Sequence, residues 1–164
     1  SADLIMRVKD YYDGAEPSGN STAISALLRL AKITDNKKYR EPAMASLAQF
    51  SSKITQFPGA VPYMVGAVDF SANEPKRVVL VGDVNSEPVQ NMLRIIHGNY
   101  QPNKVVLGTE GPVEEFSRTT LKKQAKKGEV VVFLCQGKFC ELPTGDPKKV
   151  IEGLGRSELK PEEE

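Results

Sequence analysis

Two short stretches of the sequence concentrate side chains that could do chemistry. The first is DGAEPSGNS, Asp13 to Ser21, which holds two carboxylates, a proline, an asparagine and two serines. The second contains Cys135 and Cys140, the only two cysteines of the chain. Paired carboxylates can carry out general acid/base catalysis, and paired cysteines can form a disulfide, exchange electrons or hold a metal. Each stretch also has a purely structural interpretation.

The Asp13–Ser21 stretch precedes an apolar helical run, so its structural interpretation is a helix entry. Polar side chains would then bond the backbone, with Asn20 or Ser21 as the N-cap. In the functional interpretation, Asp13 and Glu16 are catalytic carboxyls and Ser18, Asn20 and Ser21 bind a ligand in a cleft. The sequence favours the structural interpretation slightly and leaves both open.

The cysteine pair depends on the turn between the two residues. A two-residue turn at Gln136-Gly137 would place Cys135 opposite Lys138 and Cys140 on the diagonal. The diagonal Cα–Cα distance is roughly 7–8 Å, which exceeds comfortable disulfide reach, although a looser loop would bring the sulfurs together. We therefore expect free thiols with a packing role, ahead of a redox pair. A zinc site would need further ligands, and His97 is the only histidine, so we expect no metal and no cofactor.

Residues 1–73 are expected to form helical hairpins that position the first stretch. Apolar residues repeat at helical spacing from Ile24 to Ala31 and again from Tyr39 to Ile54, and a third helix is predicted from about Pro62. Pro42 should fall in the first turn of the second helix, where a proline costs least. The apolar stripes predict that these helices either pair in a homodimer or pack against the chain's own sheet.

Residues 74–164 are expected to form a small α/β domain that positions the cysteines. Three β-branched runs at 77–81, 104–107 and 130–134 are continuously apolar, which indicates strands covered on both faces. The fold class is therefore predicted as α/β, with a three- or four-stranded, mainly parallel sheet. Helices are expected at 86–98, within 112–127 and from Asp146-Pro147 onward. The helix within 112–127 would present Lys122, Lys123, Lys126 and Lys127 on a solvated face.

Parallel strands would bring Gly82-Asp83, Gly108-Thr109 and Gln136-Gly137 to one edge of the sheet, where open α/β sheets bind ligands. The chain has no GxGxxG or GxxxxGK[ST] loop, so nucleotide binding lacks its phosphate cradle. The net charge of +1 does not suggest a nucleic-acid partner. No apolar run is long enough for a membrane span, and two cysteines without a disulfide framework fit a reducing cytoplasm.

Several motifs together resemble one family. DGAEPSGNS, ALLRLAKIT, KYREPAMASLAQF, VVLVGD, QPNKVVL and the segment from Cys135 through Cys140 to LPTGDP are similar to the YyaL-type thioredoxin-domain-containing proteins, the spermatogenesis-associated protein 20 family. The resemblance implies a longer protein with a thioredoxin-like domain and an α/α toroid like those of sugar epimerases and six-hairpin glycosidases. It places residues 1–73 at the end of the toroid and residues 74–164 in a C-terminal α/β domain. The redox CxxC of the family has no counterpart here.

These observations support three hypotheses about function. The first is a non-catalytic C-terminal module whose partner is the remainder of a longer chain, the toroid and the thioredoxin-like domain. The second is a contribution of cleft residues around Asp13 to an enzyme acting on a carbohydrate-like small molecule. The third is a redox role for Cys135 and Cys140. Enzymatic activity is not expected of these 164 residues alone.

Overall fold

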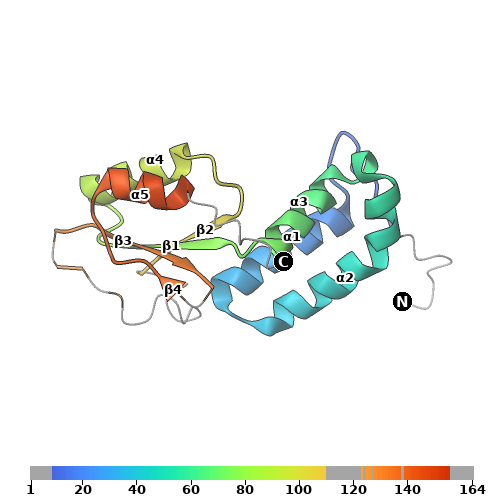
Figure 1. The fold of residues 1–164 in the computed structure, drawn as a ribbon, viewed down its shortest axis with the longest axis horizontal. Coiled ribbons are helices and arrows are strands. Elements are labelled where there is room, and N and C mark those ends of the chain that lie inside the picture. The colour runs from blue at the N-terminus through green and yellow to red at the C-terminus, as the bar shows by residue number, and fades with distance from the viewer. Residues whose placement is uncertain (1–8, 110–122, 124, 127, 138, 156–164) are drawn as a thin grey trace, which may run out of the picture. The chain divides into compact units, whose positions relative to one another are not determined.

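The structure is a computed structural model, and it describes residues 9–109, 123, 125–126, 128–137 and 139–155. The described residues form two compact units (Figure 1). The first contains the residues up to Lys32 together with Asn36–Asn73, and the second contains Ile33–Asp35 and the residues from Glu74 onward. The helix expected within 112–127 lies largely outside the described residues.

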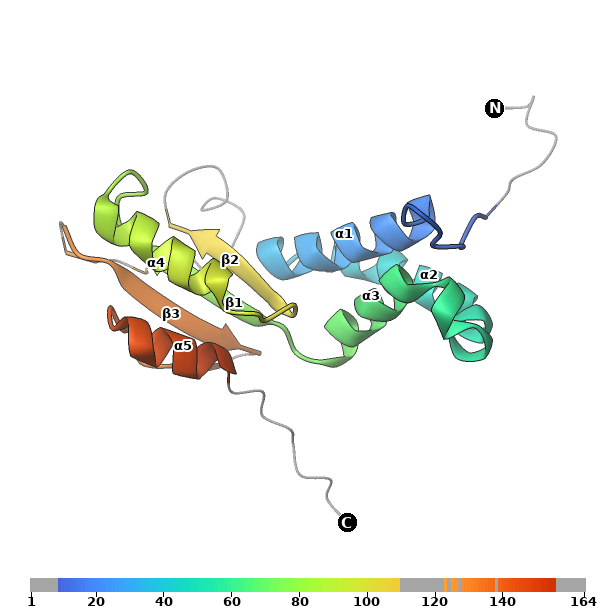
Figure 2. The same cartoon turned by 90° about the horizontal axis from the view of Figure 1, so that it is seen from above.

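The first unit is helical. It consists of α1 (Gly19–Thr34), α2 (Lys37–Gln56), a 3₁₀ turn η1 (Pro58–Ala60) and α3 (Pro62–Ala72). The three helices predicted from apolar spacing are therefore confirmed. Figure 2 shows the three helices α1, α2 and α3 of this unit.

Two local predictions in this unit were wrong. The N-cap of α1 is Ser18, whose hydroxyl oxygen accepts a hydrogen bond from the backbone N–H of Ser21 at 3.2 Å, and not Asn20 or Ser21. Pro42 lies in the second turn of α2, because that helix already begins at Lys37. Proline is tolerated there because the residues around its missing hydrogen bond are exposed, so water can satisfy the freed carbonyl group.

The apolar stripes of these helices are covered within the single chain. Ile24, Leu28, Leu47 and Phe50 are all buried, and Tyr39 is half-buried. A second copy of the chain is therefore not required to remove these side chains from water.

The second unit contains a four-stranded mixed sheet with strand order β2-β1-β3-β4. Its strands are β1 (Lys76–Val81), β2 (Lys104–Gly108), β3 (Val131–Gln136) and β4 (Phe139–Cys140). Only β1 and β2 are parallel, and β3 runs antiparallel to both β1 and β4. The prediction of a mainly parallel sheet was wrong. Continuous apolar runs report that both faces of a strand are covered, and they carry no information on its direction.

The reversal of β3 also changes which loops meet. Gly82-Asp83 and Gly108-Thr109 follow the carboxyl ends of β1 and β2, but Gln136-Gly137 lies at the opposite end of the sheet, where Cys135 pairs with Arg77 at the start of β1. The predicted common edge of three strand ends does not form.

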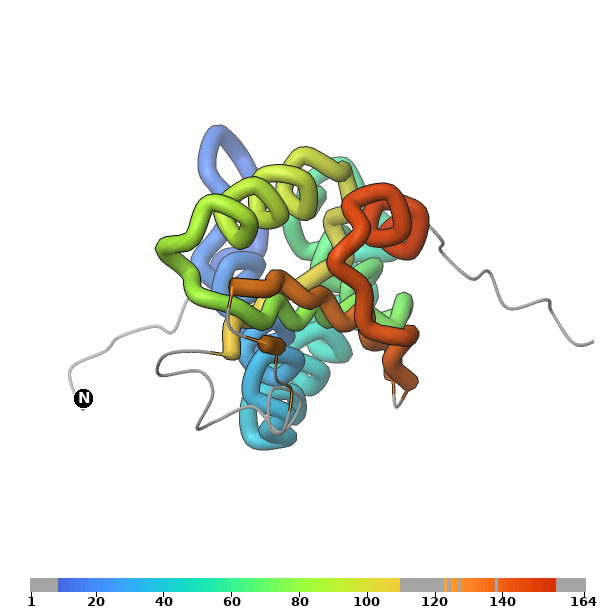
Figure 3. Tube along the Cα trace, turned by 90° about the vertical axis from the view of Figure 1, so that its left-hand side faces the viewer, coloured from blue at the N-terminus to red at the C-terminus, as the bar shows by residue number. Residues whose placement is uncertain are grey.

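One face of the sheet is covered by two helices, α4 (Glu87–Gly98) and α5 (Pro147–Gly155), as Figures 1 and 3 show. The cluster on this face combines strand residues with Val89, Met92, Ile96, Val150 and Leu154 from the helices. Alternation along β1 places Val78 and Leu80 on this face and Arg77, Val79 and Val81 on the other. Ser86 is the N-cap residue of α4, but its side chain makes no capping hydrogen bond, whereas the Asp146 carboxylate before α5 accepts the N–H of Lys148 at 2.9 Å.

Two lysines at the starts of neighbouring strands cap the two helices. Lys76 and Lys104 are register partners in β1 and β2. The Nζ atom of Lys76 donates to the carbonyl oxygen of Gly153 at 2.5 Å, and that of Lys104 donates to Ile96 at 2.7 Å and Asn99 at 2.6 Å. Cations at helix C-termini satisfy free carbonyl groups and favour the helix dipole. Burial lowers the pKa of Lys104.

Candidate functional site

The carboxylate of Asp13 is buried and is used by the backbone. Its Oδ1 accepts the N–H of Ser18 at 2.8 Å, and its Oδ2 accepts those of Tyr63 at 2.9 Å and Met64 at 3.3 Å. Tyr63 and Met64 lie in the first turn of α3, where backbone N–H groups have no partner within the helix. Asp13 therefore links the residue that starts α1 to the first turn of α3.

The backbone of Asp13 strengthens the same link, because its N–H donates to the carbonyl oxygen of Ala60 at 2.9 Å. Ser18 and Ser21 are buried and their hydroxyl groups bond each other at 2.9 Å, while the side-chain amide of Asn20 donates to the Asp10 carbonyl at 2.5 Å. Ser18, Asn20 and Ser21, which were predicted to bind a ligand, thus have hydrogen-bond partners within residues 10–21.

Glu16 differs from the rest of the loop. It is exposed, and among the described residues no hydrogen bond or ion pair involves its carboxylate. The structure does not bring it together with Asp13 in any shared hydrogen bond.

The hydrogen bonds around Asp13 decide its titration. Burial raises the pKa of its carboxyl group, but the hydrogen bonds from Ser18, Ser21, Met64 and Tyr63 outweigh burial and leave the pKa below the ordinary aspartate value. A general acid that works near neutral pH needs a raised pKa, so this environment is suited to a permanently charged helix cap.

The two cysteines are joined by a disulfide, so the prediction of free thiols was wrong. Cys135 pairs directly with Cys140 across β3 and β4, with their Cα atoms 3.9 Å apart. Gln136 pairs with Phe139, so the two-residue turn begins at Gly137 and not at Gln136. This shift of one residue moves Cys140 from the diagonal to the position opposite Cys135, where a disulfide can form.

The sequence contained a signal for the turn but not for its register. Gly137 has a φ of 58°, which glycine adopts at little cost. Type II′ hairpin turns have glycine at the first central position and type I′ turns favour it at the second, so Gly137 marks a turn here but is compatible with both registers.

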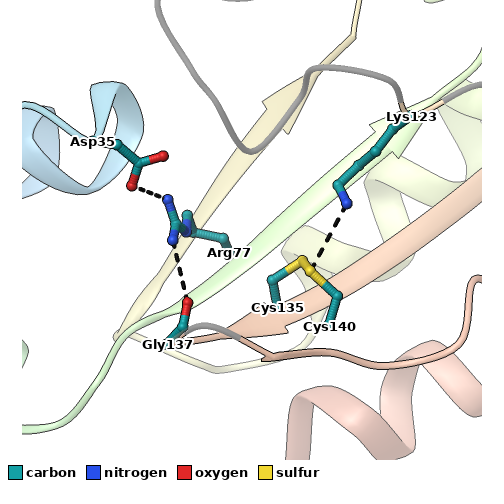
Figure 4. The surroundings of a disulfide bond; sticks show 6 residues. All are labelled: Asp35, Arg77, Lys123, Cys135, Gly137 and Cys140. Carbon is teal, nitrogen blue, oxygen red and sulfur yellow. Dashed lines mark hydrogen bonds and ion pairs between the residues drawn. A yellow bond between two sulfur atoms is a disulfide. The ribbon is translucent and has the colours of Figure 1, made fainter.

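Two cations lie on the same face of the sheet as the disulfide (Figure 4). Arg77 is the register partner of Cys135; its guanidinium group forms an ion pair with Asp35 and donates to the Gly137 carbonyl at 3.4 Å. Its buried Nε atom has no hydrogen-bond partner among the described residues.

Lys123 approaches the disulfide from the other side. Its Nζ atom lies 3.8 Å from the Cys140 sulfur, to which it donates, and 4.3 Å from the centre of the Phe133 ring. Burial lowers the pKa of Lys123, and the nearby charge of Arg77 lowers it further. The prediction that Lys123 lies on a solvated helix face was wrong, because its side chain is half-buried. It is covered by its contacts with the Phe133 ring and the Cys140 sulfur. No spacing in the sequence connects it to residues so far along the chain.

Among the described residues, no helix is both long and apolar enough to cross a membrane. The same residues contain no group of three or more His, Cys, Asp or Glu side chains placed to hold a metal ion.

Comparison with known proteins places the chain among longer relatives. It is 33% identical over 152 residues to spermatogenesis-associated protein 20 of Mus musculus and 32% identical over 152 residues to the protein of that name in Homo sapiens, in each case over 89% of this chain. It is 29% identical over 142 residues to an uncharacterized protein of Caenorhabditis elegans. The chain spans only about 19% of the length of the two mammalian relatives. No family model and no solved structure matches it.

The resemblance drawn from the sequence motifs is thus confirmed by similarity along most of the chain. The residues described here correspond to a segment of the spermatogenesis-associated protein 20 family.

Proposed function

We propose that the chain acts as a structural, non-catalytic module of a longer protein. The family resemblance implies that the longer protein has a thioredoxin-like domain and a glycosidase-like α/α toroid, with these residues at its C-terminal end. The length of the relatives supports the proposal that the chain is part of a longer protein, because the chain spans about 19% of their length.

The hydrogen bonds of Asp13 are the observation that carries the non-catalytic role. Both carboxylate oxygens accept backbone N–H groups, from Ser18 on one side and from Tyr63 and Met64 on the other. A catalytic carboxyl group must exchange a proton with a substrate or approach it as a nucleophile. An aspartate that performed either task would have to give up bonds that fix the starts of two helices.

A cytoplasmic location belongs to the same proposal. Cytosolic disulfides are usually transient, catalytic or redox-sensing. The Cys135–Cys140 disulfide means that the cysteines no longer support a reducing compartment by being free thiols. In the cytoplasm, this disulfide would be expected to have a redox role.

Carbohydrate titration tests the non-catalytic role directly. The 164-residue chain would be titrated with a panel of mono- and oligosaccharides while the amide resonances of residues 13–21 are followed by NMR. We expect no saturable change at these residues. Saturable shifts that Glu16→Gln abolishes, with an unchanged free energy of unfolding, would overturn the proposal in favour of a carbohydrate cleft. Glu129→Gln, at another exposed glutamate, is the matched control.

A further inference from the structure

The disulfide of the second unit has two unlike ends. Cys135 lies in β3 with 2% of its surface exposed. Cys140 lies in β4, an exposed two-residue strand at the edge of the sheet. A reagent in solution therefore has access to one side of the bond and not to the other.

The accessible sulfur is also the one beside a cation. The ammonium group of Lys123 lies 3.8 Å from the Cys140 sulfur, and among the described residues no carboxylate lies within ion-pair distance of that lysine. Arg77 occupies the register position opposite Cys135 on the same face. Positive charge around a sulfur attracts an incoming thiolate and stabilises the thiolate that exchange produces.

A purely structural cross-link would achieve little at this position. The bond closes a loop with a sequence separation of 5, and a disulfide constrains the unfolded chain least when its loop is short. The hairpin is already held by its turn and by the hydrogen bond from the Glu141 N–H to the Leu134 carbonyl at 2.8 Å.

We infer that Cys135–Cys140 is a thiol–disulfide exchange site that accepts two electrons from a dithiol. One thiolate of the dithiol attacks the Cys140 sulfur and forms a mixed disulfide, while the bond to Cys135 breaks and its electron pair leaves on the Cys135 sulfur. The second thiolate of the dithiol then attacks the dithiol's own sulfur in the mixed disulfide. This step releases the Cys140 thiolate beside Lys123 and leaves the dithiol oxidised to its disulfide.

Reduction under native conditions tests this site. Dithiothreitol is the probe, and alkylation followed by mass spectrometry gives the reduced fraction while circular dichroism reports the fold. We expect complete reduction without denaturant and without loss of helical signal. Reduction that occurs only once denaturant unfolds the chain would overturn the inference.

Variants of two lysines test the role of the cation. Lys123→Met should slow the reduction by roughly three- to tenfold, because one charge near the attacked sulfur is lost, and added salt should reduce that difference. Lys126→Met, at an exposed lysine nearby in sequence, should match the wild type. Equal rates for the wild type and Lys123→Met at low salt would refute the role assigned to Lys123.

Trapping with glutathione identifies the attacked sulfur without any variant. Oxidised chain incubated with reduced glutathione should give a mixed disulfide at Cys140, located by peptide mass spectrometry. Two single-cysteine variants test the same assignment. Cys135→Ser leaves the Cys140 thiol, which should react readily with a chromogenic disulfide. Cys140→Ser leaves the Cys135 thiol, which should react slowly until the chain is unfolded. Glutathione found on Cys135 would contradict the proposed direction of attack.

Discussion

The loop around Asp13 and the hairpin around Cys140 both stand out in the sequence for their chemistry, but the structure uses their charges in different ways. In the loop, the carboxylate of Asp13 is occupied by three backbone N–H groups. In the hairpin, the ammonium group of Lys123 contacts a sulfur and an aromatic ring and pairs with no described carboxylate. A group is therefore recognised as available for chemistry by whether the fold already occupies it with hydrogen bonds or ion pairs. The density of polar residues in the sequence does not give this information.

The largest effect is expected when the carboxylate of the loop is removed. Asp13→Ala should lower the free energy of unfolding by about 2–4 kcal/mol, because it leaves the first turns of two helices without an acceptor. Asp13→Asn should cost about 1–3 kcal/mol, because the NH2 group of asparagine is a donor and cannot accept a hydrogen bond from the backbone N–H groups on its side. Urea unfolding measures both. An asparagine variant as stable as the wild type would break the contrast between loop and hairpin.

A smaller effect should separate two lysines of the second unit. Lys104→Met should cost about 1–2 kcal/mol, because Lys104 donates to two carbonyl groups at the end of α4. Lys123→Met should cost about 0.5 kcal/mol, the usual worth of a half-exposed cation over an aromatic ring. Urea unfolding of the two variants, with Lys126→Met as the control, measures the difference. A larger loss for Lys123→Met would mean that this lysine stabilises the fold and is not kept for exchange.

The loop should also give the chain a pH-dependent stability. The folded pKa of Asp13 is lowered, so the unfolded chain takes up a proton at this residue at a higher pH than the folded chain does. The stabilisation is complete above the ordinary aspartate pKa of about 3.9 and is lost as pH falls toward the folded value. The difference in unfolding free energy between wild type and Asp13→Asn should therefore shrink as pH falls through the ordinary aspartate pKa and then through the lower folded one. A difference that stays constant with pH would show that charge plays no part.

The smallest effect is expected at the second carboxylate of the loop. Glu16→Gln should change the free energy of unfolding by less than about 0.5 kcal/mol, as is usual for exposed residues without partners. Thermal unfolding of this variant beside Asp13→Asn gives the comparison. A loss as large as that of the Asp13 variant would show that the two carboxylates act together.

Most of the fold could be predicted from local patterns. Helical spacing located α1, α2 and α3, and the apolar runs located β1, β2 and β3 to within one or two residues. The direction of β3 could not be predicted in this way, because a strand with both faces covered looks the same in either direction.

The candidate sites were harder, because their partners come from distant residues. Nothing near Asp13 indicates that Tyr63 and Met64 bond its carboxylate, and nothing near Cys140 indicates Lys123. The disulfide was missed by a single residue in the turn, because glycine occurs at either central position of two-residue hairpin turns and so does not fix the register.

An NMR pH titration can show whether the Asp13 carboxylate accepts hydrogen bonds from the backbone at the starts of two helices. The amide protons of Ser18, Tyr63 and Met64 should shift together, with one shared inflection below the ordinary aspartate pKa, because all three donate to the same carboxylate. Separate inflections, or a shared one above the ordinary value, would contradict the account and return Asp13 to the acid/base chemistry that its sequence suggests.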